Sequence, residues 1–242
     1  MIFSINVHEN VPFLLKQLDN IQEHVAEKHW IILSCNEYMH NALKTVTLPR
    51  NVIVNPHIIN KTVFHGSLMH GIYSNLLLAM SNFTFSYFII LSSRTFFYNK
   101  LTTSVLDELQ PRCTDLGFYR HLTIHTNRVY TEWTWRYFMY SELLKYFMKK
   151  NLNFHSCPHE GLVFHYEVCR TMIQFLENHP DIKDNLILFY GCVEEFALQT
   201  IAMNVRNLHH TYVGYSYIGT GIKTWTEPPN DPKAFVYKIA RR

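Results

Sequence analysis

The residues of this chain best suited to acid–base chemistry are two adjacent carboxylates, Glu194 and Glu195. They follow Gly191 and an apolar run, Leu186 to Tyr190, which we expect to be a buried strand, and they begin a helix predicted from Val193. Acidic residues in a first helical turn can simply complement the helix dipole. At the end of a strand, one of them can instead serve as a general base that takes a proton from an attacking hydroxyl. Spacing alone leaves both interpretations open.

A second group of candidate side chains lies in the loop from His155 to His159, which contains Cys157 and is followed by His165. Histidine and cysteine are zinc ligands. The loop, however, has neither a paired Cys-x-x-Cys nor the helical His-Glu-x-x-His pattern. A structural or solvent-facing role is therefore the simpler interpretation, and a zinc hydrolase that uses His155, Cys157 and His159 is an alternative.

Several common phosphate-binding and metal-binding motifs are missing from the sequence. It contains neither of the glycine-rich phosphate loops, GxxxxGKS and GxGxxG, and no Asp-x-Asp pair. Ordinary ATP or dinucleotide chemistry therefore lacks its usual cradle. A nucleotide sugar bound here would need lysine or arginine, rather than a cation held by carboxylates, to neutralise its diphosphate. We therefore expect no metal and no other cofactor.

Length, composition and charge restrict the class of protein. With 242 residues, 48% of them hydrophobic, the chain can bury one sizeable core. A net charge of +3 without a long basic run argues against nucleic acid as the main partner. The basic residues concentrated near the C-terminus fit a small anionic ligand, and they are Lys233, Lys238, Arg241 and Arg242.

Neither a membrane span nor a signal peptide is predicted, because no segment approaches roughly 20 uncharged apolar residues and the N-terminus lacks a charged region and cleavage site. We expect a cytoplasmic protein from the sequence as given, with the Golgi lumen as the alternative for a trimmed chain. Five irregularly spaced cysteines do not indicate a disulfide framework.

The elements that must position these residues are predicted from hydrophobic periodicity. We expect strands at Met1–Val7, Trp30–Leu33, Asn51–Val54, Tyr87–Leu91, Leu186–Tyr190 and Ala234–Ile239. We expect helices at Pro12–Val25, Gly66–Met80, Trp135–Met148 and Val163–Leu176, and from Val193 onward. Short apolar strands that alternate with amphipathic helices predict a single α/β domain with a mainly parallel sheet flanked by helices. Ligands of such sheets bind outside the carboxyl ends of the strands.

Several segments follow one another in an order that is typical of one family. They are Ile2-Phe-Ser-Ile-Asn-Val-His8, Asn51-Val-Ile-Val54, Val63-Phe-His-Gly-Ser67, Tyr87-Phe-Ile-Ile-Leu-Ser-Ser93, Val193-Glu-Glu-Phe-Ala-Leu-Gln-Thr200 and Phe235-Val-Tyr-Lys238. The last two are similar to the motifs Pro-Asp-Glu-x-x-Trp-x-Thr and Phe-Ala-Arg-Lys. In this order the chain resembles the core-2/I-branching family of β-N-acetylglucosaminyltransferases and peptide O-xylosyltransferases.

The resemblance implies a GT-A-like, Rossmann-related fold. It also implies an inverting, metal-independent transfer of a sugar, xylose or N-acetylglucosamine, from a UDP-sugar to a hydroxyl of a glycan or glycoprotein. It makes Glu195 the catalytic base and Lys238 a ligand of the diphosphate. The donor-binding residues that we expect are Val7, His8, Asn36, His65, Lys223, Lys238 and Arg241. The acceptor-binding residues that we expect are Trp135, Glu160 and Glu194. Residues 1–110 then form the nucleotide-sugar-binding half, and residues 111–242 the acceptor-binding half with Glu195 and the basic C-terminal segment.

Two departures from the family pattern bear on the donor. Where the family has Leu-Ser-Gly-x-Asp-Tyr-Pro, this chain has Leu91-Ser-Ser-Arg-Thr-Phe-Phe97. Its second strand ends in Ser34-Cys35-Asn36, where the family usually has an aspartate that contacts the nucleoside. The missing aspartates permit an alternative function, that of a catalytically inert carbohydrate-binding or scaffold protein with the same fold.

Overall fold

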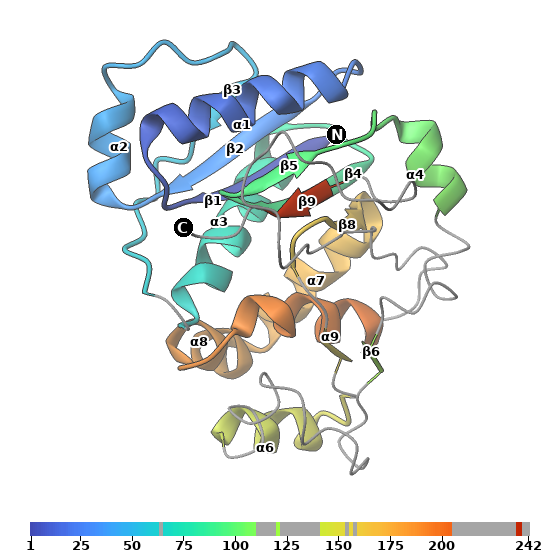
Figure 1. Cartoon of the computed structure of the whole chain (residues 1–242). Coiled ribbons are helices and arrows are strands. Elements are labelled where there is room, and N and C mark those ends of the chain that lie inside the picture. The colour runs from blue at the N-terminus through green and yellow to red at the C-terminus, as the bar shows by residue number, and fades with distance from the viewer. Residues whose placement is uncertain are drawn as a thin grey trace.

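A five-stranded sheet in the order β3-β2-β1-β4-β8 forms the centre of the protein (Figure 1). The computed structural model describes residues 1–62, 65–109, 120–121, 141–152, 155–156, 159–204 and 236–238. The strands of this sheet are β1 (Ile2–Val7), β2 (Trp30–Cys35), β3 (Val52–Val54), β4 (Tyr87–Ser92) and β8 (Leu162–His165). The first four are parallel, and β8 runs antiparallel to β4. The predicted mainly parallel sheet is confirmed.

Two short antiparallel pairs join segments that are far apart in the sequence. Strand β5 (Thr95–Phe97) pairs with β9 (Val236–Lys238), and β6 (Arg120–His121) pairs with β7 (His155–Ser156). Strand β9 lies within the strand predicted at Ala234–Ile239. The pairing brings the segment around Lys238 back to the first half of the chain.

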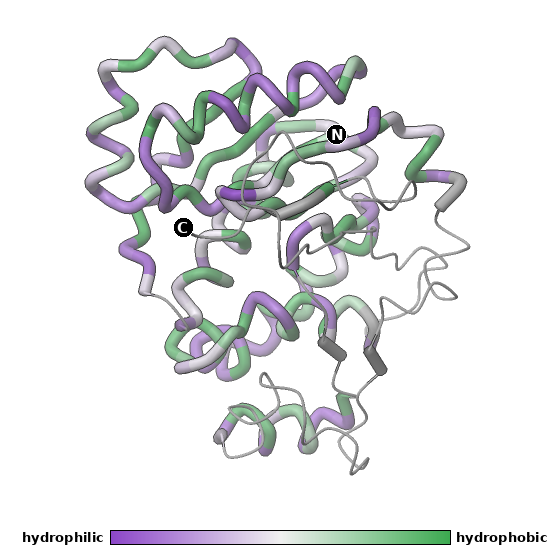
Figure 2. Tube along the Cα trace, in the orientation of Figure 1, coloured by the Kyte–Doolittle hydropathy of each residue, from purple (hydrophilic) through white to green (hydrophobic). Residues whose placement is uncertain are grey.

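Helices cover both faces of the central sheet, as predicted. They are α1 (Val11–His24), α2 (Glu37–Leu43), α3 (Ser67–Asn82), α4 (Thr103–Leu109), α6 (Glu142–Lys149), α7 (Tyr166–Asn178), α8 (Pro180–Leu188) and α9 (Ala197–Asn204). Apolar side chains of α1 and α2 pack with one face of β1, and those of α3, α7, α8 and α9 pack with the other. Figure 2 shows the alternation of hydrophilic and hydrophobic residues along α1. No helix within the described ranges is long and apolar enough to cross a membrane.

The two faces of β1 differ in polarity, and this difference positions α3. Phe3, Ile5 and Val7 belong to the apolar cluster beneath α1, whereas Ser4 and Asn6 point to the α3 face. There, the Asn75 side-chain amide donates to Ser4 Oγ at 3.0 Å, and the Asn6 amide donates to the Leu68 carbonyl at 2.8 Å. Because buried polar groups need partners, these contacts fix α3 along the strand.

The start of α3 lies directly against α8. The Gly66 N–H donates to the Phe189 carbonyl at 2.8 Å, and a Cβ on Gly66 would lie 2.0 Å from the Leu186 carbonyl oxygen. Gly66 has φ −55° and ψ −13°, which any residue can adopt. The absence of a side chain, and not backbone freedom, is therefore what this contact requires.

Two predicted elements of the second half are wrong. Leu186–Tyr190 is not a strand, because α8 continues to Leu188 and buries Ile182 and Leu186, one turn apart. The helix predicted from Val163 begins only at Tyr166, because the residues before it pair with β4. In both cases a short apolar run fits a strand and a buried helix equally well.

Other predicted elements of the second half agree in part. The helix predicted from Trp135 is α6 from Glu142 onward, and residues 135–140 lie outside the described ranges. The helix predicted from Val193 begins as a 3-10 turn, η2 (Val193–Glu195), and continues as α9. Glu194 and Glu195 therefore follow a helix and not a strand.

Gly66→Ala should destabilise the protein by about 1–3 kcal/mol, because the new methyl group overlaps backbone carbonyl groups that cannot rotate away. The measurement is the free energy of unfolding in urea. Ser81→Ala, at an exposed position of α3, is the control and should change stability little. Equal stability of the two variants would contradict the close contact between α3 and α8.

Candidate functional site

The strand order shows at which edge of this sheet a ligand is expected. Strands β2 and β3 lie on one side of β1, and β4 lies on the other. The order along the chain therefore reverses between β1 and β4, and open α/β sheets bind ligands at the carboxyl ends of the two strands at such a point. Asn6 pairs with Ser92 at the end of this register. The residues that follow β1 and β4 are thus brought side by side.

Four polar residues from these two strand ends contact one another, and we call them the β1–β4 cluster: His8, Glu9, Ser93 and Arg94. His8 Nε2 lies 2.9 Å from Ser93 Oγ. Arg94 Nε lies 3.5 Å from Glu9 Oε1, and His8 Nε2 lies 3.9 Å from the same oxygen. The side chains of His8, Glu9 and Arg94 are 29%, 26% and 15% exposed. The cluster is therefore partly desolvated yet reachable from solvent.

A buried glutamine holds the turn that carries Arg94. The Gln17 side-chain amide donates to the carbonyls of Ser92 and Thr95, both at 2.7 Å. Ser92 Oγ lies 2.9 Å from Thr95 Oγ1, and the Arg94 N–H donates to Ser92 Oγ at 3.4 Å. Gln17 comes from α1, the helix that follows β1. The helix therefore fixes the loop after β4 relative to the end of β1.

Two further predicted residues lie at the same edge. Lys238 pairs through its backbone with Thr95, directly after the Arg94 turn. Glu160 precedes β8, and because β8 is antiparallel to β4 its first residues lie beside the carboxyl end of β4. The Glu160 side chain is 2% exposed, and its Oε1 lies 3.5 Å from His159 Nε2. The structure thus brings His8, Glu160 and the Lys238 backbone to one edge.

The remaining predicted donor residues of the first half have local partners. Val7 is fully buried in the α1 face, so only its backbone can reach a ligand. Asn36 caps α2, with Oδ1 accepting from the Met39 N–H at 2.9 Å. His65 Nδ1 accepts from the Ser67 N–H at 3.0 Å, and its ring meets that of Tyr190 edge to face, with centroids 5.8 Å apart.

Glu194 and Glu195 differ in exposure. Glu194 is 7% exposed, and its carbonyl accepts from the Gln199 side chain at 3.0 Å, whereas Glu195 is half-buried. Burial, followed by the charges of Glu195 and Glu194, raises the pKa of the Cys192 thiol above its ordinary value. Of the two residues, Glu195 is thus the more exposed.

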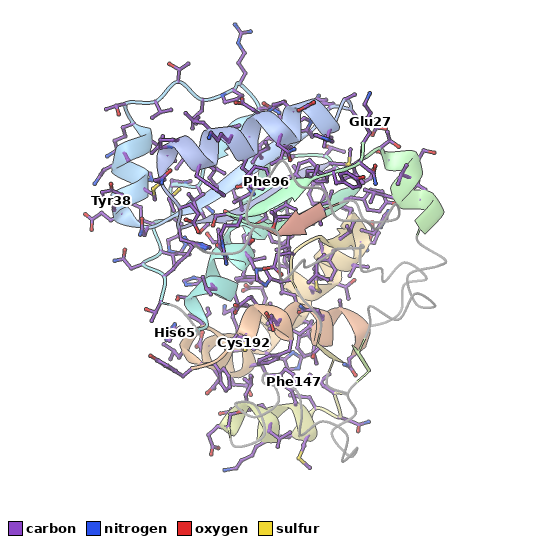
Figure 3. The ribbon with its side chains drawn as sticks, viewed as in Figure 1. Glu27, Tyr38, His65, Phe96, Phe147 and Cys192 are labelled. Atoms are coloured by element: carbon purple, nitrogen blue, oxygen red, sulfur yellow. The ribbon has the colours of Figure 1, made fainter. Side chains whose placement is uncertain are left out.

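The 3-10 turn that carries these carboxylates packs against α3. Figure 3 shows His65, just before α3, and Cys192, just before η2, near each other in this view. The first turn of α3 also accepts the hydrogen bond from Asn6. Helix α3 therefore links the Glu195 turn to the end of β1.

Three predicted site residues, Trp135, Lys223 and Arg241, lie outside the described residues, as does Cys157 of the zinc alternative. Within the part of the chain that the structure describes, no three His, Cys, Asp or Glu side chains are grouped so that they could hold a metal ion.

Lys61 is a polar residue of this edge that sequence reasoning missed. Its ammonium donates to the Ser34 carbonyl at 2.8 Å, at the end of β2. Burial lowers the pKa of Lys61 from 10.5 to about 8, and the neighbouring Cys35 opposes part of this shift. Glu9, Arg94 and Gln17 were also missed. A single basic residue in a loop gives no sequence signal that separates it from a surface lysine.

A scan against protein-family models finds no match, and no curated protein matches the sequence. Among solved structures, the chain is similar to an active-site mutant of LgtC, with 11% identity and a TM-score of 0.46, over 100% of this chain and 88% of that chain. It is also similar to the mannosyltransferase Ktr4p from S. cerevisiae, with 10% identity and a TM-score of 0.28, over 81% of this chain and 55% of that chain.

Gln17→Leu should lower the free energy of unfolding by about 2–4 kcal/mol, because it leaves two buried carbonyl oxygens without their donor. Gln22→Leu is the matched control on the same helix. Gln22 is only partly buried and bonds to the Asn51 side chain, so we expect a loss below about 1 kcal/mol. Urea unfolding of both variants measures the difference, and equal losses would contradict the role of Gln17.

The partly buried ammonium of Lys61 predicts a pH dependence of stability. Its pKa is about 8 in the folded protein and 10.5 ordinarily, so between these values the unfolded state binds more protons and stability rises with pH. Relative to Lys61→Met, the free energy of unfolding of the wild-type protein should rise by roughly 1 kcal/mol between about pH 7 and about pH 9. Urea unfolding at both pH values measures this gain. The exposed Lys145→Met variant should show no such difference, and parallel curves for wild type and Lys61→Met would refute the burial of the charge.

Proposed function

We propose that this chain is a glycosyltransferase with a GT-A-like fold that moves a sugar from a nucleotide-sugar donor to a glycan hydroxyl. The β1–β4 cluster is the observation that carries the proposal. It places one arginine, paired with Glu9, and the hydrogen-bonding side chains of His8 and Ser93 at the carboxyl ends of the two strands between which the strand order reverses. A nucleotide with a diphosphate suits such an edge, because the site offers fixed charge and partial desolvation.

The order of motifs along the chain supports a finer proposal: membership of the core-2/I-branching and peptide O-xylosyltransferase family. The reaction would then be inverting and metal-independent, with a UDP-sugar as donor and a glycan or glycoprotein as acceptor. The transferred sugar would be xylose or N-acetylglucosamine. His8, Asn36 and the Val7 backbone would contact the nucleotide, and Glu160 would contact the acceptor.

In the proposed reaction, Glu195 takes the proton of the acceptor hydroxyl as that oxygen attacks the anomeric carbon. The bond between this carbon and the diphosphate oxygen breaks on the opposite face, and the diphosphate leaves with the bonding electrons. Lys238, together with Lys223 and Arg241, balances the charge that develops on the leaving group. The greater exposure of Glu195 supports its choice over Glu194.

A second candidate function is that of an inert carbohydrate-binding or scaffold protein. It is favoured by one observation, the presence of serine and arginine rather than carboxylates after β4. The two functions differ in turnover. A glycosyltransferase should slowly hydrolyse or transfer its donor, and a metal-independent one should do so in EDTA, whereas a binding protein should only be stabilised by its ligand with or without Mn²⁺.

Glu195→Gln should reduce donor turnover by about 10²- to 10⁴-fold, because the amide cannot accept the acceptor proton. Thermal stabilisation by UDP should persist in this variant, since the base does not hold the nucleotide. The measurement compares release of UDP from a panel of UDP-sugars, in EDTA, by wild type, Glu195→Gln and the exposed-residue control Glu23→Gln. Full activity of Glu195→Gln would exclude its role as base. Stabilisation by UDP without turnover in the wild type would favour the inert alternative.

A further inference from the structure

Arg94 is the side chain of the β1–β4 cluster with the most fixed charge, because a guanidinium stays protonated at any physiological pH. We propose that Arg94, oriented by Glu9, binds the diphosphate of the donor and so occupies the role that a divalent cation would otherwise have at this edge. This inference rests on the proposed function. It adds two residues, Arg94 and Glu9, to the donor site.

The position of Arg94 in the sheet is the first observation that supports a phosphate-binding role. Arg94 follows β4 by two residues, and Glu9 follows β1 by two residues, so both lie at the point where the strand order reverses. Thr95, the next residue, pairs with Lys238. Arg94 thus lies between the end of β1 and the strand that carries the predicted diphosphate lysine.

The hydrogen bonds that hold the turn around Arg94 are the second observation that supports this role. The carbonyls on both sides of Arg94, those of Ser92 and Thr95, accept hydrogen bonds from the buried amide of Gln17. The Arg94 N–H itself donates to Ser92 Oγ at 3.4 Å. A cation whose backbone is already fixed needs little reorganisation when a ligand arrives, and preorganisation of this kind strengthens binding.

The contact between Arg94 and Glu9 is the third observation that supports this role. Arg94 Nε lies 3.5 Å from Glu9 Oε1, and the Arg94 side chain is 15% exposed. A guanidinium presents its five N–H donors in a planar fork. The Glu9 carboxylate lies beside the Nε edge of this fork, and its charge restricts how the guanidinium turns. Glu9 is therefore a positioning residue, and Arg94 is the residue that touches the phosphates.

The chemistry of the ligand follows from this geometry. Planar, bidentate recognition by arginine suits phosphate oxygens. His8, hydrogen-bonded to Ser93 at 2.9 Å, adds a polar contact beside the fork. The cluster should therefore distinguish a nucleoside diphosphate from the nucleoside alone, and should do so without a divalent cation.

The test is isothermal titration of the full chain with UDP, UMP and uridine in EDTA. Arg94→Ala should weaken UDP binding by at least about tenfold, the scale for losing a charged hydrogen bond, and leave uridine binding unchanged. Arg94→Lys should be intermediate, because lysine keeps the charge but not the fork. Glu9→Gln should weaken UDP binding less than Arg94→Ala does. Arg170→Ala is the control, because Arg170 also pairs with a glutamate, its Nη2 lying 2.6 Å from Glu167 Oε2, but on the exposed side of α7. This variant should bind UDP as the wild type does.

The outcomes separate this inference from the proposed function. The role of Arg94 would be overturned if the wild type bound UDP no better than uridine. It would also be overturned if the Arg94→Ala and Arg94→Lys variants bound UDP as tightly as the wild type. Both results would leave the glycosyltransferase proposal standing. Wild type that binds no nucleoside diphosphate, with or without Mn²⁺, would overturn the proposed function itself. UDP binding that appears only with Mn²⁺ would refute the substitution of Arg94 for a metal.

Discussion

Parallel pairing of β1 with β2 on one side and with β4 on the other is the constraint on which the rest of the site depends. Every residue of β1 is buried, so the strand cannot slip by one position without turning Phe3 and Ile5 towards the polar contacts of α3. This fixed register sets where β1 ends relative to β4. The loops after the two strands are therefore adjacent, although they are far apart in the chain.

Helices on the two faces use different interactions to hold this arrangement. Helix α1 packs apolar side chains on the sheet and sends one buried amide, that of Gln17, to the loop after β4. Helix α3 uses a buried polar network, in which Asn75 contacts Ser4, the Ile32 carbonyl and Asn55. Apolar packing alone tolerates small shifts, whereas buried hydrogen bonds do not. The polar contacts thus give the carboxyl edge a more definite geometry than packing would.

The first half of the fold could be predicted from the sequence because local signals agree there. Strand β4 is a nearly uninterrupted apolar run, and β1 is apolar apart from Ser4 and Asn6. Helix α1 begins with a capping asparagine, Asn10, and a proline in its first turn. In the second half, the run from Leu186 to Tyr190 satisfies helix and strand patterns alike, and packing against α3 decides for the helix. Glu195 could be singled out only by the order of motifs. Arg94 and Glu9 could not, because their contact depends on strand pairing that local patterns do not specify.

The pairing of β5 with β9 has a consequence for the order of assembly. Strands β1 to β5 and helices α1 to α3 are contiguous in the first part of the chain and can associate while the remainder is still being synthesised. Strand β9 arrives much later and adds only three residue pairs. The sheet and the Gln17-bound turn can therefore form before Lys238 is available. A nascent chain in which β9 has not yet emerged can therefore form the central sheet while still lacking Lys238, the predicted ligand of the diphosphate.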